Sequence, residues 1–125
     1  MYTFVVINRQ HRILPEQYNI LKKEFGKFYK IQVPPEGWTL TQQMSLVEKL
    51  SELADKHGIN VVFISPVPLL IALLSYESAL RKHIKHAKPL NVYIFHNDKR
   101  IKKELPDGRV ISVIPEEGWK LVEVV

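Results

Sequence analysis

Apolar runs alternate with helical patterns over the first 95 residues, and no other feature of the sequence constrains the fold as strongly. Runs typical of strands lie at residues 2–7, 27–33, 59–64 and 90–95. Between them, apolar residues recur at helical spacing at about residues 15–25, 39–57 and 68–87. Strands that alternate with helices form βαβ units around a parallel sheet. We therefore predict an α/β protein, with a small Rossmann-like parallel sheet and helices on both faces.

Local signals mark the ends of the first two predicted helices. Pro15 suits a first helical position, and Gly26 suits the position just after a helix. Thr39 or Thr41 can cap the second helix, which we expect to end before Gly58.

The first half of the third helix has no polar face. Residues 69–74 are apolar all round, and a helix of this kind is normally buried on every side. A chain of 125 residues has little material for such burial within one copy. The pattern therefore predicts a symmetric dimer contact through this helix.

Antiparallel strands are expected after residue 95. Two alternating segments, residues 100–105 and 109–114, flank Asp107-Gly108, which is a strong hairpin signal. Residues 119–125 add a last strand, so the fold should end in an antiparallel β-hairpin or meander. The length fits one domain, residues 1–125.

Several classes of site have no counterpart in the sequence. The chain has no cysteine, and its five histidines are not spaced with carboxylates as metal ligands are. No glycine-rich phosphate loop follows the first strand. We therefore expect no metal and no cofactor. No apolar run approaches the roughly 18 residues of a membrane span, and no leader is apparent, so we expect a cytoplasmic protein without a membrane partner.

Polar clusters follow three of the predicted parallel strands. The carboxyl ends of such strands open on one edge of the sheet, where ligands bind at the switch point of the strand order. Two arginines in this set favour an anionic ligand. The predicted site residues are Asn8, Arg9, Gln10, His11 and Arg12 after the first strand, Ser65 and Pro66 after the third, and His96 and Asn97 after the fourth.

The residue types after the first strand suggest separate tasks. Arg9 or Arg12 can neutralise a phosphate, Asn8 can pair with a base or ribose edge, and His11 can transfer a proton near neutral pH. The alternative interpretation is an ordinary polar loop with a solvated histidine. We favour function because the predicted topology places this loop on the ligand edge.

Two other positions have a functional and a structural interpretation. The Ser65 hydroxyl can help to hold a phosphate at a helix N-terminus, or it can cap that helix. Pro66 removes one of the backbone amides that an anion would need. Trp38 and Trp119, each after a glycine, can stack on a base, although an aromatic side chain that covers the core edge is the more common arrangement.

The net charge of +5 and the pI of about 9.5 favour acidic partners, but they are also common solubility features. Cationic side chains are concentrated at residues 81–88 and 99–103. Those in the last turn of a helix also complement the helix dipole. Charge alone therefore leaves a nucleic-acid-binding or partner-docking role open.

A family resemblance is carried by the first polar loop. Asn8, His11, Ile13 and Gln17 lie at the spacing found in a group of small CRISPR-associated proteins of type III systems, which have a CARF-like Rossmann fold. In that group the first strand runs into an Asn, an aromatic, a Ser, a His, a Pro and a Leu, and a Gln lies on the next helix. Asn8, His11 and Gln17 match this pattern and Ile13 stands in for the Leu, whereas the aromatic, the Ser and the Pro are replaced by Arg9, Gln10 and Arg12. The chain resembles the group also in its third strand, which ends in Ser65-Pro66 before an Ala/Leu-rich helix.

The resemblance implies a homodimer that binds a cyclic oligoadenylate, such as cyclic tetra-adenylate, in a cleft across its two-fold axis. It also implies that the protein either cleaves this ligand as a ring nuclease or sequesters it. We favour slow cleavage without a metal, and from the residue types of the loop we predict His11 and Arg12 as catalytic residues. A sponge or sensor without catalysis is the first alternative. A general nucleic-acid-binding or partner-docking domain is the second, although we expect no stable complex with long nucleic acid.

Overall fold

A five-stranded sheet forms the centre of the protein in a computed structural model that describes residues 1–99 and 101–125. Its strands are β1 (Tyr2–Asn8), β2 (Tyr29–Val33), β3 (Ile59–Phe63), β4 (Leu90–Asn97) and β7 (Trp119–Glu123). Their order across the sheet is β2-β1-β3-β4-β7. The first four are parallel, and β7 pairs antiparallel with β4.

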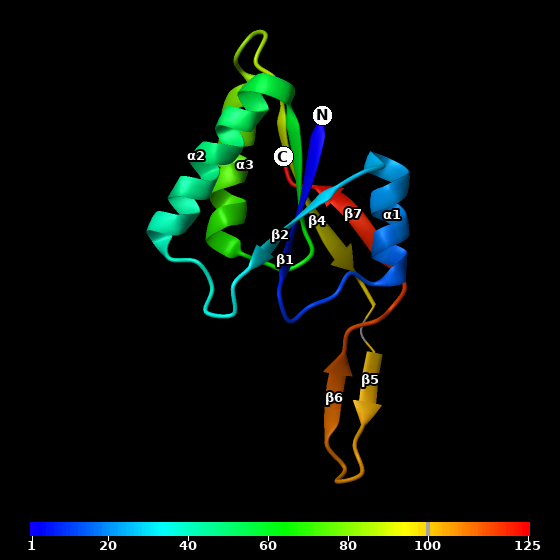
Figure 1. The fold of residues 1–125 in the computed structure, drawn as a ribbon. Coiled ribbons are helices and arrows are strands. Elements are labelled where there is room, and N and C mark those ends of the chain that lie inside the picture. Colours follow the sequence, from blue (N-terminus) through cyan, green and yellow to red (C-terminus); the bar gives the residue numbers. More distant parts are fainter. Residues whose placement is uncertain (100) are drawn as a thin grey trace.

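Three helices cover the two faces of this sheet. They are α1 (Pro15–Phe25), α2 (Leu40–His57) and α3 (Pro68–Lys82). Figure 1 shows α2 and α3 side by side on one face and α1 on the other. The predicted fold class, a small Rossmann-like sheet with helices on both faces, is confirmed. Within the described part of the chain, no helix combines the length and apolarity needed to cross a membrane.

The first two helices begin at the predicted signals. Pro15 opens α1, and the Gln17 side chain accepts a hydrogen bond of 3.0 Å from the backbone amide of Leu14. Thr39, not Thr41, caps α2. Its hydroxyl accepts from the Gln42 amide at 3.1 Å while the Gln42 side chain accepts from the Thr39 amide at 2.8 Å. This reciprocal pair is a capping box, which fixes where α2 starts.

The core is divided by the sheet. Under α2 and α3 lies the larger cluster of buried residues, and the smaller cluster under α1 is built on Val5, Leu21 and Val62. All five residues of β3 are buried, as expected for a central parallel strand with both faces covered.

A polar ladder crosses the buried centre of the sheet. The Asn60 amide nitrogen donates to the Thr3 hydroxyl at 3.2 Å, and the Asn91 amide nitrogen donates to the Asn60 carbonyl oxygen at 3.0 Å. These residues are register partners on β1, β3 and β4. Because an unpaired polar group is costly in a core, the ladder favours this register over a slipped one.

Helix α3 ends at Lys82, so the prediction that it reaches residue 87 is wrong by about a turn. Arg81 is only 8 % exposed, and its guanidinium donates to the carbonyl oxygens of Ser51 at 2.9 Å and Lys88 at 3.1 Å. The chain turns back after Lys82 and so brings Lys88 to Arg81. A continued helix would carry Lys88 away from that guanidinium.

The apolar run at the start of α3 is buried on one side only. Leu70 and Leu74 are fully buried against the sheet and α2, whereas Leu69 is 42 % exposed. Tyr76 and Leu80 continue the exposed side at helical spacing. A single copy therefore leaves an apolar stripe of α3 uncovered.

The predicted hairpin is a separate two-stranded sheet of β5 (Ile101–Glu104) and β6 (Val110–Val113). It projects beyond the carboxyl end of β4 (Figure 1). The connection is longer than the expected two-residue turn, because the Leu105 amide donates to the Arg109 carbonyl oxygen across three residues, with Gly108 at φ 84°. Strand β7 returns to the main sheet and does not extend the hairpin.

Candidate functional site

The strand order places a switch point between β1 and β3. After β1 the chain moves outward to β2, and after α2 it enters the sheet again on the other side of β1, as β3. Loops from these two central strands therefore leave the carboxyl edge in opposite directions, which opens the crevice where α/β proteins bind ligands. The loop of residues 8–12 and the Ser65-Pro66 turn lie at this position.

Ser65 joins the two loops. It is 3 % exposed, and its hydroxyl oxygen accepts a hydrogen bond of 2.8 Å from the Asn8 backbone amide. The same oxygen lies 2.6 Å from Nδ1 of His11, 54 residues away in sequence. A buried hydroxyl thus fixes the ring of an exposed histidine at the switch point.

This contact defines two useful states of His11. When Nδ1–H donates to Ser65, Nε2 carries a lone pair and can accept a proton. When the Ser65 hydroxyl donates to Nδ1, Nε2–H becomes a hydrogen-bond donor to an anion. A hydroxyl supports both states because it can donate and accept.

The loop itself is shaped by Asn8. Its side-chain oxygen accepts from the Gln10 amide at 3.0 Å, and its backbone carbonyl accepts from the His11 amide at 2.9 Å. The Arg9 amide donates to the carbonyl oxygen of Val33 at 3.3 Å, which ties the loop to the end of β2. Asn8 is therefore a loop-forming residue as well as a candidate ligand contact.

Three side chains of the loop extend into solvent. Arg9, Gln10 and Arg12 are exposed, and their side chains make no hydrogen bond or ion pair with any residue that the structure describes. Two guanidinium groups without an internal partner, beside an oriented histidine, form a cationic surface that suits a phosphate.

Ser65 does not cap the helix that follows it. Helix α3 begins at Pro68 after Val67, and no side chain caps that end. Of the two interpretations of Ser65, capping is therefore wrong, and its hydroxyl is used by Asn8 and His11. Pro66 is exposed beside this contact.

The end of β4 lies on the same edge of the sheet, but its polar side chains contact other residues of the chain. Asn97 is buried, donates to the Glu117 carbonyl oxygen at 2.8 Å and accepts from the Lys99 amide at 2.9 Å. His96 is exposed, with Nε2 2.6 Å from a carboxylate oxygen of Asp98. Asn97 therefore fixes the connection toward β7, and His96 stays paired with an acid.

Other chemistry is sparse in the described residues. Among them no group of three or more histidine, aspartate or glutamate side chains is placed to hold a metal ion. Burial raises the pKa of the Tyr93 phenol above its usual 10.0, with smaller contributions from Glu123 and Glu24. Tyr93 packs on the α1 side of the sheet, within the core cluster of that face.

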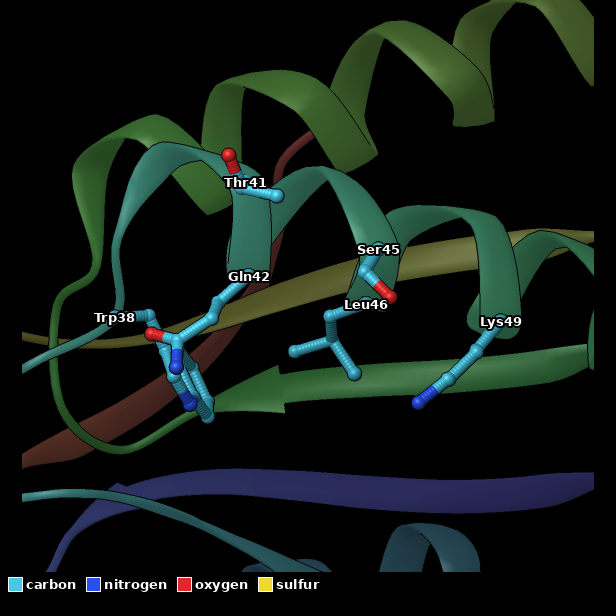
Figure 2. A pocket seen from close by; sticks show the side chains of 6 residues that line it. All are labelled: Trp38, Thr41, Gln42, Ser45, Leu46 and Lys49. Atoms are coloured by element: carbon cyan, nitrogen blue, oxygen red, sulfur yellow. The ribbon is translucent and has the colours of Figure 1, made fainter.

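A pocket of about 420 Å³ lies beside the N-terminal half of α2 (Figure 2). Among its lining residues, the sequence suggested a ligand-binding role only for Trp38. The possibility of base stacking did not by itself mark Trp38 as part of a pocket. The pattern that could have predicted the pocket is an aromatic residue just before a helix that carries polar residues at helical spacing. The pocket is lined by Trp38, Thr41, Gln42, Ser45, Leu46 and Lys49.

Comparisons of this chain with protein-family models, with curated proteins and with solved structures found no match.

Proposed function

We propose that this protein binds a cyclic oligoadenylate, such as cyclic tetra-adenylate, at the switch-point edge of its sheet and cleaves it slowly without a metal, as the CARF-like ring nucleases of type III CRISPR systems do. The observation that carries the proposal is the contact of His11 with Ser65, beside Arg9 and Arg12. It combines an oriented proton-transfer group with cations that have no ion-pair partner among the described residues.

The ligand is proposed to lie between two copies of the chain. Cyclic tetra-adenylate has two-fold symmetry, so two facing copies of a cationic edge would match it. The exposed stripe of α3 starts at Leu69, four residues after Ser65, and a contact through this stripe would bring two such edges together. Two facing copies would enclose the ligand between their switch-point edges.

Cleavage needs a base, alignment and charge compensation. The ribose 2′-oxygen attacks the adjacent phosphorus, and the bond from phosphorus to the 5′-oxygen breaks. The 2′-hydroxyl proton passes to Nε2 of His11, and the 5′-oxygen takes a proton from solvent, so the products are a 2′,3′-cyclic phosphate and a 5′-hydroxyl. Arg12, with Arg9, offsets the negative charge that develops on the phosphate. Ser65 is a positioning residue for His11.

A sponge or sensor is the second candidate, and the same contact favours it when the Ser65 hydroxyl donates to Nδ1. His11 then holds its proton on Nε2 and serves only as a hydrogen-bond donor to the phosphate. Binding by Arg9 and Arg12 would be unchanged, and no linear product would form.

Incubation with cyclic tetra-adenylate in excess EDTA tests the proposal. The wild type should release linear product, and His11→Ala should lower the cleavage rate at least about 100-fold while binding changes little. His83→Ala, at an exposed histidine just beyond α3, is the matched control and should cleave normally. Tight binding without any linear product over many hours would contradict cleavage and support the sponge or sensor.

Two further results would contradict the proposed ligand or the proposed dimer. Lack of binding to cyclic tetra-adenylate, together with a strongly salt-dependent affinity for linear RNA, would favour the general nucleic-acid-binding alternative. Sedimentation should show a wild-type dimer at micromolar concentration, and Leu69→Glu should yield monomers. A wild-type monomer under these conditions would contradict the shared cleft.

A further inference from the structure

We infer that the pocket beside α2 is a second site, which binds a nucleoside monophosphate unit with its base on Trp38 and its phosphate at Lys49. The pocket is separate from the candidate site above, because none of its lining residues belongs to the loop of residues 8–12 or to the Ser65-Pro66 turn. Its volume of about 420 Å³ is within the range of small-molecule sites.

The aromatic wall of the pocket is held in place before any ligand arrives. Trp38 packs against the larger core cluster and is only partly exposed. The side chain of Gln43 donates a hydrogen bond of 3.1 Å to the Trp38 carbonyl oxygen, and the next residue, Thr39, is fixed by the capping box of α2. A fixed indole face stacks on a base at little cost in conformational entropy.

Two polar side chains of the pocket, Gln42 and Lys49, present hydrogen-bond donors to a ligand. The Gln42 side-chain oxygen is already used by the Thr39 amide, so its NH₂ group is the part left for a ligand. Lys49 forms no ion pair with any described residue, and no carboxylate lines the pocket. Figure 2 shows Trp38 and Lys49 extending to the same side of α2, one on each side of Leu46.

This arrangement selects a class of ligand. Trp38 and Leu46 offer a flat aromatic and an aliphatic wall, which suit a purine ring. A single ammonium group without a competing carboxylate suits a phosphate. The shared chemistry is a base linked to a phosphate, found both in a free mononucleotide and in one unit of an oligonucleotide.

The fluorescence of Trp38 gives a direct measurement. The chain has two tryptophans, so Trp119→Phe leaves Trp38 as the only reporter, and a thermal melt checks that this variant is folded. Titration with AMP should quench the emission saturably. In this background Lys49→Ala should weaken AMP binding about 10-fold and leave adenosine binding unchanged. Lys23→Ala on α1 is the matched control and should bind AMP normally.

The ligand series separates the two sources and the two sites. Tighter binding of AMP than of each adenylate unit in linear oligoadenylate indicates a free mononucleotide as the ligand, and the reverse indicates an oligonucleotide. His11→Ala should leave AMP quenching intact, since the sites share no residue. No saturable quenching at millimolar AMP, or equal losses in Lys49→Ala and Lys23→Ala, would overturn the inference without affecting the cleavage test.

Discussion

The loop of residues 8–12 and the segment of residues 81–88 are both rich in cationic side chains, but the fold uses them differently. In the segment, Arg81 is buried between α2 and α3, with its guanidinium 2.8 Å from Asp55 and 3.3 Å from Glu77. Lys88 donates to the Lys56 carbonyl oxygen at 2.6 Å and so satisfies the last turn of α2. In the loop, Arg9 and Arg12 extend into solvent.

The difference shows that a cluster of positive charge does not identify an anion site by itself. A guanidinium whose donors are used by carbonyl and carboxylate oxygens of the same chain has little capacity left for a ligand. Cationic side chains that have no partner within the chain and lie beside an oriented polar group are better candidates for an anion site. The cationic segment of residues 81–88 therefore supports the fold through Arg81 and Lys88, and the loop after β1 supports the proposed site.

Removal of the Arg81 side chain should have the largest effect and would test the structural half of this comparison. Arg81→Ala leaves the carbonyl oxygens of Ser51 and Lys88 without their donor, and two carboxylates lose their partner. We expect the free energy of unfolding to fall by about 3 kcal/mol, measured by urea denaturation. An unchanged midpoint would mean that this network contributes little to stability.

Arg9→Ala and Arg12→Ala should have the next largest effect, on binding and not on stability. Each substitution should weaken the binding of cyclic tetra-adenylate by about 2 kcal/mol if the arginine's guanidinium makes a charge-assisted hydrogen bond to a phosphate. Titration calorimetry measures the affinity, and urea denaturation should give the wild-type curve. A loss of stability with full affinity would reverse the roles assigned to the two regions.

Lys85→Ala should have the smallest effect. Lys85 lies in the turn after α3, is exposed, and has no side-chain hydrogen bond or ion pair within the described ranges 1–99 and 101–125. Both the urea midpoint and the affinity for cyclic tetra-adenylate should match those of the wild type. An affinity loss equal to that of Arg9→Ala would indicate diffuse attraction by the net charge of the protein.

Local patterns predicted most of the fold because the physical causes are local. An apolar run of five or six residues between helical segments favours a parallel strand buried on both faces, and Pro15 and Gly26 act on the backbone within one turn. Strands β1, β3 and β4 and helices α1 and α2 therefore lie close to the expected positions. The end of α3 was misjudged because the chain turns back after Lys82 and brings the Lys88 carbonyl oxygen to the buried guanidinium of Arg81, which no local pattern indicates.

The location of the candidate site could be predicted from the sequence, but the contacts between its residues could not. Polar residues after strands mark the carboxyl edge, and the loop of residues 8–12 lies there. Asn97 has the same kind of position, yet its amide holds the Glu117 carbonyl oxygen, 20 residues further along the chain. No local pattern separates Asn8 from Asn97, because the difference is the choice of a distant partner.

The sequence by itself determined the class of the fold, the presence of strand β3 and the position of a cationic loop at the end of β1, since burial, helix capping and turn formation act over a few residues. The tertiary structure alone decided that Ser65 orients His11, that Arg81 is a structural residue, and that Trp38 and Lys49 line one pocket. These outcomes depend on contacts between residues on separate elements, and only the packing of the whole chain brings those residues together.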